Sequence, residues 1–255
     1  MSNKKAYLKE MRVDVWLERN HSIETPAQQK PVVVSSESIT PAPVEVKEAI
    51  ESEIKHDVVN PVNPVNPVNI ETLDWRALHS HVAECQLCDL SGSRTQTLFG
   101  SGSHTAPLMI IGGAPNLNDE QQGDVFSAEA GKLLSAMLKA MGFQRNQVYL
   151  SNIIKCKTPE NQEPSEQQAA SCESYLLRQI SLLKPKLILA LGTAAAQSLL
   201  KTKSNMNRLR GQLHYIDGIR SPILISYHPT YLLAAPNEKR KAWEDLQLAM
   251  KELAL

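Results

Sequence analysis

Four cysteines are the residues of this 255-residue chain whose type and spacing point most directly to chemistry. Cys85 and Cys88 form a CxxC pair, and Cys156 and Cys172 follow in two later segments. The chain shows no apolar signal-peptide core after Met1 and no run of about 18 apolar residues, so we expect a cytoplasmic, reducing setting in which disulfides are disfavoured. Metal binding and plain burial are the two remaining interpretations.

The spacing of these cysteines bears on the kind of metal centre. A zinc ribbon is expected to show a second CxxC pair, which this chain lacks, so the spacing argues mildly against zinc and leaves it open. Four thiolates gathered from distant segments suit a cubane iron–sulfur cluster.

Polar residues and glycines follow three apolar runs of the chain. Gly112-Gly113-Ala114-Pro115-Asn116 comes after the first run, Asn152 after the second and His228 after the last. Each has a plain structural interpretation, because glycine and proline mark turns, a strand-end asparagine is more often a cap, and a single histidine before proline is usually structural. Less often, residues at such places put a polar group beside a ligand.

Short apolar runs and helical periods alternate in the part of the chain that carries these residues. Four runs bounded by glycine, proline or polar residues predict buried strands at 108–111, 148–150, 187–191 and 223–225. Four segments have the length and spacing of helices, at 130–141, 165–182, 193–200 and 237–253. This order predicts an α/β fold with a parallel-type, four-stranded central sheet flanked by helices on both faces. Ligands of such sheets bind at the carboxyl ends of the strands, where the candidate residues lie.

The N-terminal part of the chain has a different texture. Residues 1–74 hold 8 Lys and Arg against 12 Asp and Glu, whereas residues 75–255 hold 19 against 15. The basic surplus is compatible with phosphate binding, but a mixed solvated surface gives the same count. Residues 23–72 are rich in proline, include three Asn-Pro-Val repeats and show no sustained period, so we expect a disordered linker.

A hydrophobic cluster precedes this linker. Tyr7, Leu8, Met11 and Trp16 stand close together in residues 1–22, where an isolated chain end offers no core to bury them. Such a cluster is either a strap folded back on the domain or a docking segment for a partner, and the long linker favours docking. The sequence thus predicts three parts, which are a docking segment at 1–22, a linker at 23–72 and one domain at 73–255.

Taken in order, the motifs resemble a family 4 uracil-DNA glycosylase over almost all of residues 80–255. The resemblance rests on Cys85-Gln86-Leu87-Cys88, Val148-Tyr149-Leu150-Ser151-Asn152-Ile153-Ile154-Lys155-Cys156, Leu209-Arg210-Gly211, Tyr227-His228-Pro229 and Ala242-Trp243-Glu244-Asp245-Leu246. It implies the uracil-DNA glycosylase fold and a DNA-repair enzyme that hydrolyses the N-glycosidic bond of a flipped uracil. It also implies a 4Fe-4S cluster on the four cysteines, Cys85, Cys88, Cys156 and Cys172.

The resemblance further implies roles for five pocket residues. Phe126 would stack on the flipped uracil, Asn152 would bond its Watson–Crick edge, and Gly112 and Ala114 would belong to the loop that binds the base. His228 would stabilise the negative charge that grows on uracil O2 as the bond breaks. A base must leave the stack to be reached, and a donor aimed at the developing charge lowers the barrier.

The first motif departs from the family pattern. Gly113 stands where the family has a glutamate, and Asn116 replaces a glycine. Asp119 and Glu120 lie nearby but match family acidic positions outside the pocket. Further replacements surround the stacking position and the His-Pro motif, namely Val125, Ser127 and Ala128 for Pro, Val and Gly, and Ala234 for an arginine. Because one catalytic group contributes about 10²- to 10⁴-fold, we expect excision that is weakened rather than abolished.

A second hypothesis of a different class concerns the N-terminus. Residues 6–16 resemble the start of the DNA polymerase III psi subunit, which binds the chi subunit. On this hypothesis the chain is a non-catalytic or weakly catalytic replisome adaptor that docks a clamp-loader chi subunit through residues 6–17.

Overall fold

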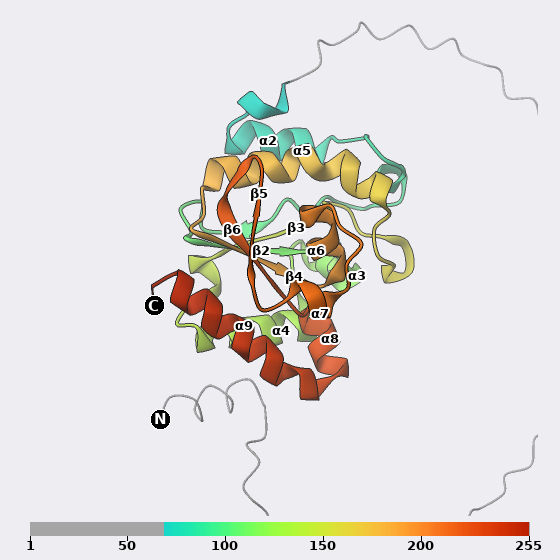
Figure 1. Ribbon diagram of the computed structural model, residues 1–255. Helices are drawn as coiled ribbons and strands as arrows, with labels where there is room; N and C mark the ends of the chain where they lie inside the picture. Colours follow the sequence, from blue (N-terminus) through green and yellow to red (C-terminus); the bar gives the residue numbers. More distant parts are fainter. Residues whose placement is uncertain (1–68, 255) are drawn as a thin grey trace, which may run out of the picture. The chain divides into compact units, whose positions relative to one another are not determined.

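The structure is a computed structural model that describes residues 69–254 (Figure 1). The predicted docking segment, and the predicted linker up to Val68, lie outside the described residues. The six strands are β1 (Ser101–Gly102), β2 (Leu108–Gly112), β3 (Tyr149–Asn152), β4 (Leu187–Leu191), β5 (Leu213–Ile216) and β6 (Ile219–Ser226).

The α-helices are α2 (Trp75–Ala83), α3 (Leu117–Gln122), α4 (Ala128–Ala140), α5 (Glu166–Leu183), α6 (Thr193–Leu200), α7 (Met206–Leu209), α8 (Pro229–Ala234) and α9 (Lys239–Glu252). Short 3-10 turns complete the fold at η1 (Ile70–Thr72), η2 (Asp89–Gly92), η3 (Arg145–Gln147), η4 (Pro159–Asn161) and η5 (Pro236–Glu238). Within residues 69–254, no helix combines the length and apolar character that crossing a membrane requires.

The strands form one mixed sheet in the order β1-β3-β2-β4-β6-β5. The four central strands are parallel, and β1 and β5 add to the two edges in antiparallel orientation. Since parallel strands end at the same edge, the residues that follow β2, β3, β4 and β6 come together there.

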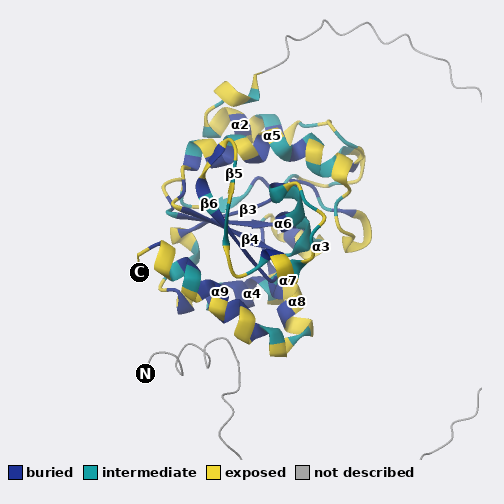
Figure 2. Cartoon of the chain, viewed as in Figure 1, coloured by how far each residue is buried: buried dark blue, intermediate teal, exposed yellow. Residues whose placement is uncertain are grey.

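Helices cover both faces of the sheet, as Figure 1 shows, with α2 and α5 on one side and α4 and α9 on the other. Successive strand residues point to opposite faces, so Leu108 and Ile110 pack with α4 and α9 while Met109 and Ile111 pack with α2, α5 and α6. All five β2 residues are buried, as the dark strands at the centre of Figure 2 show. Burial on both faces explains why these strands read as continuous apolar runs.

The predicted α/β fold is confirmed, and the four predicted strands and four predicted helices are present with boundaries within a few residues. The predicted sheet width was wrong, because the sheet has six strands rather than four. β1 has only two residues, and every residue of β5 is at least partly exposed, so neither produces a buried apolar run. The turn η1 falls within the last residues of the predicted linker, and Ile70 there packs against the core.

Candidate active site and cysteine cavity

The carboxyl ends of the parallel strands hold the predicted site residues. Gly112, the last residue of β2, pairs with Asn152, the last residue of β3. On the other side, Gly192 follows β4, and its N–H donates to the Ser226 carbonyl at 2.9 Å. His228 stands two residues after Ser226 and caps helix α8. Sheet register thus brings together residues that are far apart in the chain.

Asn152 carries a buried amide that is free to receive a ligand. Its side chain is only 2% exposed, and within the described part of the chain its amide forms no hydrogen bond. A Cβ on Gly112 would collide with Asn152 Oδ1 and would lie 2.7 Å from Cζ of Phe126. Only glycine therefore allows the amide and the aromatic ring to meet over this backbone.

Phe126 is held in an unusual backbone conformation. Its φ is 54°, and Ala128 has φ 52°, which is the left-handed region that costs L-residues free energy. The intervening residue fixes the turn, because Ser127 N–H and Ser127 Oγ donate to Asp119 Oδ1 at 2.6 and 2.5 Å. The Phe126 ring then lies 5.6 Å from the His228 ring at an interplanar angle of 25°.

His228 is placed to act as a neutral donor. Part of the ring faces solvent, but packed protein surrounds the rest, and this burial lowers the pKa of His228 from 6.5 to about 4, with only a partial opposing effect from Asp119. The Thr230 N–H donates to His228 Nδ1 at 3.2 Å. Because Nδ1 accepts, the proton of the neutral ring belongs on Nε2.

A cleft of about 1000 Å³ lies beside these residues. Gly113, Ala114 and His228 are among the residues that line it. Phe126 and Asn152 are buried next to this wall rather than along it, at 4% and 2% exposure. The structure thus gathers all five predicted pocket residues at one end of the sheet, with three of them beneath the cleft surface.

Asp119 and Glu120 do not take the place of the glutamate that is absent at Gly113, and the carboxylates of the cleft wall, Glu129 and Glu163, belong to other segments. Asp119 accepts from Asn116 N–H and Ser127, and Glu120 accepts from Thr95 N–H at 3.0 Å. Both residues are 3% exposed, and neither lines the cleft. A Cβ on Gly113 would lie 3.2 Å from Cβ of Ala194, so that methyl group occupies part of the space a side chain would need.

Two tyrosines of the cleft wall were not predicted from the sequence as site residues. Tyr227 and Tyr231 stack with centroids 5.1 Å apart, and Arg210 lies over the Tyr227 ring at 5.5 Å. Tyr231 is 48% exposed and offers an aromatic face to the cleft. The available signal in the sequence was that these two tyrosines are four positions apart and have His228 between them.

The four cysteines line one small cavity with Arg94, Lys155 and Tyr175. All four are free thiols. Burial raises the pKa of Cys172 to about 11 and also raises the pKa of Cys156, so a cation is required to hold these groups as thiolates. Among residues 69–254, no three histidine, cysteine or acidic side chains converge closely enough to hold a single metal ion. The donor set fits a cluster, whose sulfur ligands stand around a larger body.

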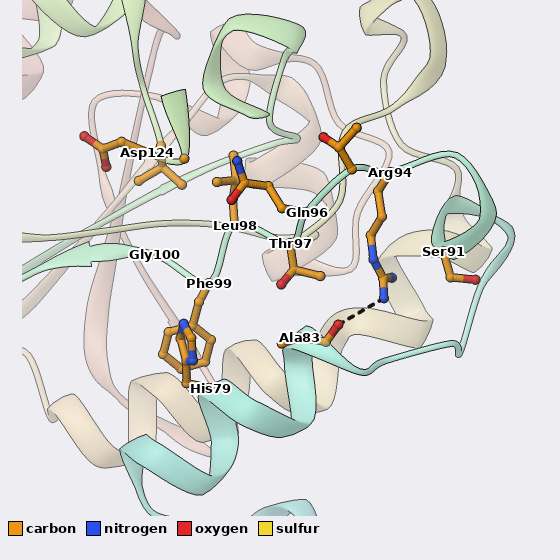
Figure 3. Close-up of a pocket in the computed structure, with 13 residues that line it drawn as sticks. His79, Ala83, Ser91, Arg94, Gln96, Thr97, Leu98, Phe99, Gly100 and Asp124 are labelled. Atoms are coloured by element: carbon orange, nitrogen blue, oxygen red, sulfur yellow. Dashed lines mark hydrogen bonds between the residues drawn. The ribbon is translucent and has the colours of Figure 1, made fainter. Parts of the chain in front are cut away.

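A second cavity of about 470 Å³ lies between the end of α2, residues 91–100 and the loop at 123–125 (Figure 3). Arg94 lines both this cavity and the cysteine cavity. Its guanidinium donates to the Ala83 carbonyl at 3.3 Å, to the Cys85 carbonyl at 2.6 Å and to Cys156 Sγ at 3.4 Å. The arginine thus separates the thiols from this opening.

Comparison with known proteins gives a consistent result. A family model described as the uracil DNA glycosylase superfamily matches residues 99–247. The chain is 30% identical over 182 residues to a type-4 uracil-DNA glycosylase of Pyrobaculum aerophilum, covering 69% of this chain and 93% of that protein. It is 33% identical over 181 residues to the type-4 uracil-DNA glycosylase of Saccharolobus solfataricus, covering 68% and 83%.

The type-4 uracil-DNA glycosylase of Thermotoga maritima is 31% identical over 172 residues, covering 66% of this chain and 88% of that protein. These comparisons give no support to the psi-like resemblance of residues 6–16, which also lie outside the described residues. The chain belongs to the uracil DNA glycosylase superfamily.

Proposed function

We propose that this protein excises uracil from DNA. The reaction breaks the N-glycosidic bond between uracil N1 and the sugar C1′, and water adds to C1′. Uracil leaves with the bonding electron pair and takes up one proton, and an abasic sugar remains in the strand. The names of the relatives, which are uracil-DNA glycosylases, give the substrate class for this proposal.

The buried, unpartnered amide of Asn152 is the observation that carries the proposal. The residue is 2% exposed and its amide has no hydrogen bond to the described residues, so the amide is available to a base that enters the cleft. An amide offers one acceptor and two donors, which complement the N3–H donor and the O4 acceptor of uracil. Cytosine presents an amino donor in place of O4 and an acceptor at N3, so an amide held in the uracil-binding orientation would reject it. The adjacent Phe126 ring supplies an apolar face for the flipped base.

His228 would assist the departure of the base. Negative charge develops on uracil as the bond breaks, and O2 carries part of it. A neutral histidine with its proton on Nε2 donates a hydrogen bond to that oxygen, and a preorganised donor of this kind contributes about 10²- to 10³-fold in rate. Because burial lowers its pKa to about 4, the ring stays neutral at physiological pH.

Water activation is the weak part of this active site. Gly113 brings no carboxylate to the attacking water, Asp119 and Glu120 are engaged elsewhere, and the cleft carboxylates Glu129 and Glu163 stand on other segments of the wall, with Glu129 paired to Lys132. Loss of one well-placed catalytic group costs about 10²- to 10⁴-fold. We therefore infer slow excision that depends on base recognition and on His228.

The four cysteines would hold a 4Fe-4S cluster with a structural role. When bound, such a cluster joins the segment after α2, the segment after β3 and helix α5 through metal–thiolate bonds. Arg94 and Lys155 would provide positive charge beside these thiolates.

A gel assay of uracil release tests this function. Full-length, iron-loaded protein is incubated with single- and double-stranded oligonucleotides that carry one uracil, and the abasic product is cleaved by alkali. Strand breaks at the uracil position, with none in a thymine control, are the expected result. No release after long incubation at enzyme excess would refute the proposal and leave the adaptor hypothesis, which no observation on the described residues favours.

A further inference from the structure

A buried cation lies between the cysteine cavity and the base-reading end of β3. Lys155 is 1% exposed, and its ammonium donates to Ser151 Oγ at 2.6 Å, to Gln179 Oε1 at 2.7 Å and to the Asn152 carbonyl at 2.8 Å. An ammonium has three protons, so these bonds use its full capacity.

The charge of Lys155 has no carboxylate partner within residues 69–254. Burial lowers the pKa of Lys155 to about 8, and the sulfur atoms of Cys172 and Cys156 would oppose this effect as thiolates. A buried charge without a partner is strongly destabilising, so negative charge on these two cysteines would offset the cost of burying the ammonium. Four thiolates on a 4Fe-4S cluster would carry more negative charge than the cluster core carries positive charge, and Lys155 and Arg94 would offset that excess.

The other side of Lys155 faces the active site. The Asn152 side chain has no hydrogen bond of its own, so the direction of its amide depends on the Asn152 backbone and on contact with Gly112. The lysine holds the carbonyl of that same residue. Gln179 in turn is fixed from behind, because its Nε2 donates to the Phe99 carbonyl at 2.8 Å and to Tyr149 Oη at 3.2 Å.

We propose that Lys155 is a positioning residue that couples the cysteine cavity to base recognition by holding the Asn152 carbonyl. The inference rests on the proposed function, because it needs Asn152 to read the base. A purely structural lysine would stabilise the fold without acting through Asn152. If Lys155 acts through Asn152, changing both residues should weaken base recognition no more than changing Asn152 alone. If Lys155 is purely structural, the effects of the two changes should be independent.

The test compares Lys155→Met, Asn152→Ala and the double variant in the full-length protein. The readout is the ratio of dissociation constants for two oligonucleotides, one with 2′-fluoro-2′-deoxyuridine, which resists cleavage, and one with the cytosine analogue. We expect Lys155→Met to lower the uracil preference about 10- to 100-fold, the size expected when a recognition group is displaced by about 1 Å. The double variant should lose no more preference than Asn152→Ala alone.

Two further variants guard against loss of the fold. Ser151→Ala removes one acceptor of the lysine and keeps its charge, so it should lower the preference several-fold and again have no added effect in the Asn152→Ala background. Lys157→Met changes a neighbouring lysine whose nearest carboxylate oxygen lies 3.9 Å away, and it should leave the preference unchanged. Iron per chain is measured for every sample, and Lys155→Met should retain less iron than Lys157→Met.

Several outcomes would overturn the proposal. One is a double variant whose loss of uracil preference equals the product of the losses in the two single variants. Another is a Lys155→Met protein with unaltered uracil preference. A failure of the proposed function alone can be distinguished from these outcomes. The wild-type protein would then bind the uracil oligonucleotide with preference but release no uracil, and the effect of Lys155→Met on that preference could still be measured. A wild-type protein with no uracil preference would refute both, since Asn152 would not read the base.

Discussion

Replacing Gly113 by glutamate should restore a catalytic group and reveal a steric conflict at the same time. A new Cβ would lie 3.2 Å from Cβ of Ala194, which is a few tenths of an ångström too close. Ala194 is the second residue of α6 and is half-buried, so the helix end can yield slightly. Overpacking costs about 1–3 kcal/mol, and we expect the lower limit here.

The magnitudes follow from these contacts. A well-placed carboxylate contributes about 10²- to 10⁴-fold, whereas a displacement of about 1 Å costs about 10²-fold. We therefore expect Gly113→Glu to raise the excision rate about 10-fold and to lower Tm by about 2–4 °C, the shift for about 1 kcal/mol in a domain of this size. The double variant Gly113→Glu/Ala194→Gly removes the methyl group and should raise the rate about 100-fold.

The assay is single-turnover uracil release at enzyme excess, with thermal melting followed on the same samples. Gly113→Gln is the matched control, because it has the same shape without the charge, and it should give the Tm shift without the rate gain. Ala194→Gly alone should leave the rate unchanged. If the double variant folds well and is no faster than wild type, the reasoning about water activation is refuted.

Four other predictions follow from the structure and the sequence. Asn152→Ala should weaken uracil recognition and His228→Ala should slow bond cleavage, each by about 1–3 kcal/mol in kcat/KM, and wild-type rates for both would remove them from the site. Cys172→Ala should lose the brown colour and iron and lower Tm, whereas metal analysis showing one zinc and no iron in the wild type would exclude the cluster. Because burial lowers the pKa of His228 from 6.5 to about 4, the unfolded chain takes up the proton at a higher pH than the folded protein does. The free energy of unfolding, measured by denaturant titration, should therefore fall as the pH drops from 6.5 towards 4. This fall should be smaller in His228→Phe, and an equal fall in both proteins would count against the prediction. In the segment outside the described residues, Trp16→Ala should weaken partner pull-down by about 2 kcal/mol without changing excision on free oligonucleotides, whereas a lower domain Tm would favour the strap hypothesis.

The sequence predicted the parts of the fold that are buried on both sides. Strands such as β4 appear as apolar runs because helices cover both faces, whereas β1 is too short and β5 too exposed to leave a pattern. Asn152 and His228 could be predicted as site residues because strand ends are local features of the chain. The partners of those residues could not be predicted in the same way, because they depend on long-range packing.

Three contacts illustrate this limit. The Ala194 methyl stands beside Gly113 from a segment about 80 residues away in the chain. Ser127 reads as a plain substitution until its bonds to Asp119 are seen. Lys155 reads as one residue of a matching motif, and only the structure shows it buried with three acceptors.

The origin of the cysteines in three segments also has a consequence for the order of events during synthesis. The ligand set is complete only when Cys172 has left the ribosome, and β6, the strand that precedes His228, ends 54 residues later. At about 5–20 residues per second, this interval lasts about 3–11 s. Early in this interval, before β4 has been made, the nascent chain already contains α2, β2, β3, α5 and the four cysteines that would hold the cluster. A cluster assembled at that stage would tie α2, the segment after β3 and α5 together before β4 covers the edge of β2.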